Sequence, residues 1–278
     1  MSTEFIDAHH HLWKYSPEHY SWIVPEMERI RRDFLIPELK AVAQEAEIEG
    51  TIAVQARQSL DETRWLLDLA VATDLIRGIV GWVPLIDIAV TKHLEAFATN
   101  PKFKGVRHVL HDEADDLFML REDFNRGVSQ LKDFGLRYDI LIFERHLSQT
   151  IQFVDRHPKQ IFVVDHIAKP RISERVRSPW QELITELSRR ENVYCKLSGM
   201  ATEANWKNWS QNDLAPYFDT ILHAFGPRRL MFGSDWPVIL LASEYKHWVD
   251  VVRSRITELS TSEQDAIMGG TAKLAYSL

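Results

Sequence analysis

The stretch IPELKAVAQEAEIEGTIAVQA, residues 36–56, places one helix and one strand in close succession. Pro37 near its start and Gly50 further on mark the limits of the predicted helix, because proline is favoured in the first turn and glycine just after the last. The apolar run at residues 51–56 has the length and composition of a strand that is buried on both faces. Such a unit is typical of a parallel sheet covered by helices.

The same alternation continues along the whole chain. Strands are predicted at residues 5–9, 51–56, 78–83, 105–110, 136–142, 161–166, 193–197 and 230–234, with amphipathic stretches at 61–74, 122–135 and 213–226 among the segments between them. No linker divides residues 1–278, so we expect a single α/β domain that forms a closed (β/α)8 TIM barrel. An open doubly wound sheet is the alternative, although no Gly-x-Gly-x-x-Gly motif follows any strand.

Composition narrows the class of protein. Of the 278 residues, 45% are apolar and 26% are charged, and the net charge of −7 predicts no nucleic-acid partner. No apolar run is long enough to span a membrane and no secretory signal is visible. The one cysteine, Cys195, fits a reducing compartment, so a cytoplasmic location is expected. Whether the protein is a monomer or a homo-oligomer stays open.

The segment FIDAHHHLW, residues 5–13, carries the first candidate site residues. Side chains alternate along a strand, so His9 and His11 share one face with Asp7 while His10 points the other way. Long connections follow the first, fourth and seventh strands, at residues 12–35, 111–120 and 198–213. In barrels the loops after the strands build the active site, which predicts that His9 and His11 lie at its mouth.

Other ionisable residues fall at the ends of the later strands. They are Arg107, His108, Asp139, Asp165, His166, Lys196 and Asp235. Imidazoles with a carboxylate can bind a divalent metal. Without a metal, histidines can polarise a carbonyl while Asp235 takes a proton from water. Either route predicts attack of water on an electrophilic carbon, although Arg107 and Lys196 can equally be partners in buried ion pairs.

Aromatic residues are clustered in the same loops. Trp13, Tyr15, Tyr20 and Trp22 lie in the first, and Trp206 and Trp209 in the seventh. They can stack on the apolar face of a sugar-like ring or pack the loops against the barrel rim. We take Trp13 and Trp206 as candidate substrate contacts.

Seven motifs together resemble a known family from end to end. They are IDAHHHLW, ETRWLLDLA, GVRHVL, VVDHIAKP, CKLSGM, TEANW and RLMFGSDWPV. They resemble the amidohydrolase superfamily, in the branch of sugar-lactone hydrolases that includes L-fuconolactonase, L-rhamnonolactonase and pyrone-dicarboxylate lactonase. The resemblance implies a distorted (β/α)8 barrel that opens a lactone ring, such as that of L-fucono- or L-rhamnonolactone.

The resemblance also implies roles for particular residues. His9, His11, His166 and Asp235 would be catalytic, with Asp235 as the general base, and would hold one divalent metal, zinc or manganese, if one is bound. Arg107, His108 and Lys196 would contact the substrate. The carboxylated lysine or paired histidines of a two-metal centre are not found, and catalysis without metal stays open. The alternatives are a decarboxylase of a small unsaturated acid and a barrel that only binds a sugar acid.

Overall fold

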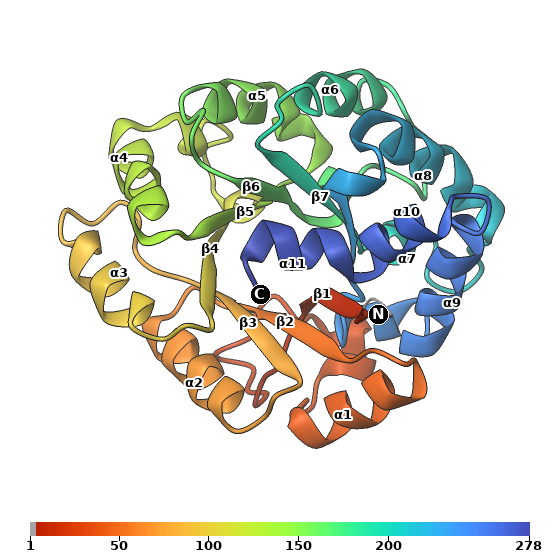
Figure 1. The fold of residues 1–278 in the computed structure, drawn as a ribbon, viewed down its shortest axis with the longest axis horizontal. Coiled ribbons are helices and arrows are strands. Elements are labelled where there is room, and N and C mark those ends of the chain that lie inside the picture. Colours follow the sequence, from red (N-terminus) through yellow and green to blue (C-terminus); the bar gives the residue numbers. More distant parts are fainter. Residues whose placement is uncertain (1–3) are drawn as a thin grey trace.

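Eight parallel strands form one sheet in the order of the chain, from β1 to β8, in the computed structural model, which describes residues 4–278 (Figure 1). The strands are β1 Ile6–His10, β2 Gly50–Val54, β3 Ile76–Gly81, β4 Phe103–Val109, β5 Arg137–Leu141, β6 Phe162–Val164, β7 Val193–Leu197 and β8 Leu230–Phe232. Each pairs with its neighbours along the chain. The expected α/β barrel is therefore confirmed, and the open doubly wound sheet is excluded.

The barrel closes where β1 meets the chain just after β8. His10 and Trp236 form a parallel bridge, and the amide of His11 donates to the carbonyl of Trp236 at 2.6 Å. The amide of Asp235 donates to the carbonyl of His9 at 2.8 Å. These bonds join the two segments that carry most of the predicted site residues.

Helices form a ring around the strands (Figure 1). They are α1 Ile36–Glu45, α2 Leu60–Val71, α3 Val90–Ala98, α4 Glu122–Leu131, α5 Leu147–Asp155, α6 Trp180–Leu187, α7 Met200–Glu203, α8 Gln211–Phe225, α9 Tyr245–Arg255, α10 Thr261–Asp265 and α11 Thr271–Tyr276. Most of the core lies between this ring and the sheet. Within residues 4–278, no helix combines the length and apolar character needed to cross a bilayer.

Helix α11 covers the end of the barrel at which the strands begin (Figure 1). Its residues Ala272, Ala275 and Tyr276 pack against a separate apolar cluster inside the barrel, made by β1, β2, β3, β6 and β8. Lys104, near the start of β4, donates to the carbonyl of Ser277 at 2.7 Å. The interior of the barrel is thus filled at this end, so a ligand can enter it from the other end.

Most strand boundaries differ from the predicted ones by one or two residues, and the differences at α1, β6 and β8 concern turns. Gly50 does not end helix α1 but begins β2, where a Cβ would lie 2.5 Å from the Cδ1 atom of Ile6. Glu47, with φ of 60°, turns the chain after α1 instead. Strands β6 and β8 end two residues before the predicted positions, and the chain turns after them at His166 and Asp235, which have positive φ angles of 52° and 58°.

Candidate active site

A cavity of about 300 Å³ opens at the ends of the strands. Its walls include His11, Trp22, Arg107, His111, His166, Lys169, Glu203, Trp206 and Asp235. The strands converge here, and the loops after β1, β4, β6 and β7 all contribute side chains. This is the position expected for an active site in this architecture.

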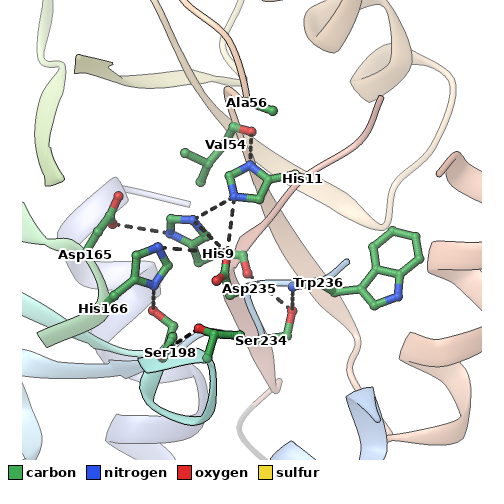
Figure 2. A network of polar contacts seen from close by, with 12 residues as sticks. His9, His11, Val54, Ala56, Asp165, His166, Ser198, Ser234, Asp235 and Trp236 are labelled. Atoms are coloured by element: carbon green, nitrogen blue, oxygen red, sulfur yellow. Dashed lines mark hydrogen bonds and ion pairs between the residues drawn. The ribbon is translucent and has the colours of Figure 1, made fainter. Parts of the chain in front are cut away.

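Three imidazoles, two of which line this cavity, and one carboxylate face one another (Figure 2). The Nε2 atoms of His9 and His11 are 3.2 Å apart. The Oδ1 atom of Asp235 lies 3.3 Å from Nε2 of His11, 3.7 Å from Nε2 of His9 and 3.9 Å from Nε2 of His166. This oxygen is buried and has no hydrogen-bond donor among the described residues. An unpartnered buried carboxylate oxygen indicates that a further group belongs beside it.

Each imidazole is fixed through its other nitrogen. Nδ1 of His11 lies 2.8 Å from the carbonyl oxygen of Val54, so that nitrogen carries the proton and donates it. Nδ1 of His9 lies 3.3 Å from Asp165, and Nδ1 of His166 lies 2.9 Å from the hydroxyl of Ser198 (Figure 2). The Nε2 atoms are therefore directed at the cavity, in the way that outer partners orient metal-binding histidines.

Burial sets the charges of this cluster. It lowers the pKa of His9 well below its ordinary value and that of His166 to about 4, so both are neutral at pH 7. Burial alone would raise the pKa of Asp235, but His166, His11 and His9 outweigh it and the pKa lies below its usual range. Neutral imidazoles beside an ionised carboxylate are the protonation states that a metal requires.

The residues present fit one divalent metal ion. His9, His11 and Asp235 offer ligand atoms within 4.8 Å of one another. Two nitrogen ligands of a tetrahedral zinc ion are about 3.3 Å apart, because each lies about 2.0–2.1 Å from the metal. The 3.2 Å between the Nε2 atoms of His9 and His11 matches this spacing. A second group, of His9, Asp165 and His166, is a weaker candidate, because Lys196 and Arg107 already neutralise Asp165.

His10 and Asp7 have structural roles. The ring of His10 points away from the cluster, as its parity predicts, and its Nε2 lies 3.0 Å from the hydroxyl of Thr51. Asp7 accepts hydrogen bonds from the Ser234 hydroxyl at 2.6 Å and the Tyr245 hydroxyl at 2.9 Å. It ties β1 to the turn that carries Asp235 and does not belong to the candidate metal ligands.

Lys196 and Arg107 are members of a buried ion-pair network. Nζ of Lys196 is fully buried, 2.5 Å from Asp139 and 2.9 Å from Asp165, and Nη1 of Arg107 lies 3.0 Å from Asp165. Lys196 does not line the cavity, and its ammonium group is engaged by two buried carboxylates, so its contact with substrate stays a prediction. Arg107 does line the cavity and can still reach a ligand.

Two further expected substrate contacts lie away from the cavity walls. His108 follows Arg107 on β4 and therefore points to the opposite face, where it lies 2.6 Å from Glu113 and stacks on Phe118. Trp13 is fully buried, and its indole nitrogen donates to the carbonyl of Arg32 at 2.8 Å. Both side chains are held by contacts with the surrounding loops, so a contact of either with the substrate stays a prediction.

Trp206 lines the cavity as expected, and it is joined by residues that the sequence did not single out. These are Lys169, Glu203 and His111. His111 stacks on Phe143 with ring centroids 4.6 Å apart. Lys169 lies in the motif VVDHIAKP, three residues after His166, but the backbone turn that brings them to one side has no signature in the sequence.

Fold and site together define a hydrolase type of barrel with residues that could hold one divalent metal ion, and comparison with known proteins agrees. The family model described as amidohydrolase matches residues 6–278, so the chain belongs to the amidohydrolase family. It is 39% identical to an L-fucono-1,5-lactonase from Burkholderia multivorans, over 100% of this chain and 97% of that protein. It is 34% identical to an L-fucono-1,5-lactonase from Burkholderia ambifaria, over 86% of this chain and 82% of that protein.

A solved structure shows the same likeness in three dimensions. An amidohydrolase from Burkholderia multivorans with bound zinc superposes with a TM-score of 0.95 at 39% identity, over 99% of each chain. The fold and family that the motifs indicated are therefore confirmed.

Proposed function

We propose that this protein hydrolyses a sugar 1,5-lactone, with L-fucono-1,5-lactone as the leading substrate. The observation that carries the proposal is the convergence of three oriented Nε2 atoms on the unpartnered Oδ1 atom of Asp235 within one cavity. The names of the two Burkholderia relatives indicate the substrate. Those names also make the decarboxylase and the non-catalytic barrel less favoured than the lactonase.

One divalent metal ion would be held by His9, His11 and Asp235. Zinc is the leading candidate, because the similar Burkholderia multivorans structure contains zinc, and manganese is the alternative. When bound, such an ion lowers the pKa of a water molecule and polarises a carbonyl group.

The side chains supply the proton transfers. Asp235 stays ionised at neutral pH and can accept a proton from water as the water adds to the lactone carbonyl. The same carboxyl group can then protonate the ring oxygen, which leaves as an alcohol. The Ser198 hydroxyl can donate to Nδ1 of His166, which keeps the proton of His166 on Nε2, facing the cavity. A donor in that position stabilises the oxyanion formed on the former carbonyl oxygen.

The biological setting follows from the same proposal. A lactone of this class is a small neutral intermediate of carbohydrate metabolism. The single cysteine, Cys195, is buried and unpaired, which is consistent with the proposed cytoplasmic location. We further propose that residues 1–278 act as one catalytic domain.

A panel of aldonolactones, assayed by proton release at constant pH, tests this function. We expect acid release with L-fucono-1,5-lactone and a fall in kcat of roughly 10²- to 10⁴-fold in Asp235→Asn, which keeps the shape of the side chain but cannot accept the proton. Asp250→Asn, on the exposed face of α9, is the matched control. Carbon dioxide release would indicate a decarboxylase. Retention of more than about a tenth of kcat in Asp235→Asn would assign the base to another residue.

A further inference from the structure

We propose that Lys169 and Glu203 form a subsite that recognises the hydroxyl groups of the substrate and so restricts the enzyme to neutral polyhydroxylated lactones. The inference rests on the proposed lactone hydrolysis and adds the residues that determine specificity. Both side chains line the cavity that holds His11, His166 and Asp235.

The backbone is built to place Lys169 there. The four residues from His166 to Lys169 have φ angles of 52°, 50°, 63° and 46°, a left-handed turn made without glycine. Such conformations are unfavourable for residues with a Cβ atom and persist at functional sites where the surroundings enforce them. Trp180 donates to the carbonyl of Ile167 at 2.8 Å, and the amide of Lys169 donates to the carbonyl of His166 at 2.8 Å.

This turn explains why two side chains reach the same cavity. In a turn with about three residues per revolution, positions three apart lie on the same side. His166 and Lys169 have this spacing, and both line the cavity. The strained turn thus places the His166 imidazole near the Asp235 carboxylate and the Lys169 ammonium group at another part of the cavity wall.

The Lys169–Glu203 pair has the chemistry of a hydroxyl-binding site. Nζ of Lys169 lies 3.3 Å from Oε1 of Glu203, and each side chain is 22% exposed. An ammonium group has three donors and a carboxylate has only acceptors, whereas a hydroxyl group both donates and accepts. One hydroxyl, or two neighbouring hydroxyls, can therefore bond to both members of the pair at once.

An aromatic residue follows this pair closely in the sequence. Trp206 follows Glu203 by three residues, lines the same cavity, and is fixed by a 2.8 Å bond from its indole nitrogen to the carbonyl of Thr202. Indole rings pack against the apolar C–H face of a sugar ring while polar neighbours bind its hydroxyls. A polyhydroxylated ring matches the combination of Trp206, Lys169 and Glu203.

The charge balance of the cavity argues for a neutral substrate. Of the residues that line it, the cations are Arg107 and Lys169, and each is already paired with a carboxylate, Asp165 or Glu203. Asp235 would balance part of the charge of a metal ion. A carboxylate group on the substrate would therefore find no unpaired cation among the described lining residues, and burying it without one is costly.

The test compares two lactones in four proteins. The lactones are L-fucono-1,5-lactone and δ-valerolactone, which has the same ring without hydroxyl groups. The proteins are the wild type, Lys169→Met, Glu203→Gln and the control Lys207→Met, which alters an exposed lysine in the loop after β7. The readout is the ratio of kcat/KM for the first lactone to that for the second, with the melting temperature measured for each variant.

We expect this ratio to fall roughly 10- to 100-fold in Lys169→Met and in Glu203→Gln, the range for losing a hydrogen bond to a charged group, and to stay within about twofold in Lys207→Met. An unchanged ratio in both site variants overturns the inference. Glu203→Gln keeps the side-chain shape, so it remains informative if Lys169→Met does not fold. In the wild type, 2-pyrone-4,6-dicarboxylate should be the poorer substrate; equal or better turnover of it refutes the neutral-substrate claim. If the wild type hydrolyses no lactone, the proposed function itself has failed.

Discussion

Replacing Lys196 with methionine should destabilise the barrel and weaken catalysis without a direct effect on substrate binding. Its ammonium group lies 2.5 Å from Asp139 and 2.9 Å from Asp165, and all three side chains are fully buried. Removing one partner of a buried ion pair costs about 3–5 kcal/mol, because it leaves charge without compensation. Of the two carboxylates, Asp165 keeps Arg107 at 3.0 Å, whereas Asp139 keeps only the hydroxyl of Tyr276 at 2.8 Å.

The loss of stability should depend on pH. Burial already raises the pKa of Asp139 to about 6 while Lys196 is present, so removing the lysine raises it further. A carboxyl group with a raised pKa in the folded state lowers the stability of the protein at pH values above its unfolded pKa. There the group is ionised in the unfolded chain but resists ionisation in the folded one. The cost of Lys196→Met should therefore be largest near pH 8 and smaller near pH 5.

Equilibrium denaturation at both pH values measures this cost, with Lys207→Met as the exposed control. We expect a loss of about 3–5 kcal/mol at pH 8 and a lower kcat, since Nζ of Lys196 also lies 3.1 Å from Nδ1 of His9. A raised KM with stability changed by less than about 1 kcal/mol would refute this reasoning, because buried pairs cost more than that, and would return Lys196 to the substrate-binding residues.

Three further outcomes are expected. His9→Ala and His11→Ala should each lower kcat by at least about 100-fold. His10→Gln alters a 3.0 Å bond to a threonine hydroxyl and should instead cost about 1 kcal/mol of stability. Equal loss of activity from all three changes would contradict the assignment of His10 to the opposite face. Burial raises the pKa of Glu62 to about 7, so the protonated side chain favours the folded state fully below the unfolded pKa, and this contribution is lost as the pH rises through 7. Glu62→Gln should therefore be more stable than the wild type by up to about 3 kcal/mol at pH 8, measured by denaturation, and little different at pH 4. A gain that does not vary with pH would contradict this. A chelator should remove activity, and about one equivalent of zinc or manganese per chain should restore it together with the melting temperature; full activity in protein shown to be metal-free by elemental analysis would contradict the metal site.

The eight strands could be predicted because parallel strands buried on both faces read as short apolar runs. The ends of β6 and β8 could not, because the left-handed conformations of His166 and Asp235 depend on distant contacts, such as the 2.8 Å bond from the amide of Asp235 to the carbonyl of His9. Local patterns describe the strands themselves but not the turns that aim the side chains into the cavity.

The placement of His9 and His11 followed from alternation along a strand. The same rule, applied to β4, places His108 on the opposite face from Arg107. Lys196 is different, because an inward-facing lysine suits both a substrate contact and an ion pair. Its partner Asp139 is 57 residues away. The choice between the two roles depends on which strands are neighbours and on their register, which only the folded barrel shows.

Hydrolysis of L-fucono-1,5-lactone in water enriched in oxygen-18 tests the central claim most directly. If water adds to the carbonyl carbon, mass spectrometry of the product formed in one turnover should find one labelled oxygen in the new carboxylate and none in the released hydroxyl. Label in the hydroxyl would show that water attacks the ring carbon instead. Absence of any product at high enzyme concentration would show that the protein does not open this lactone.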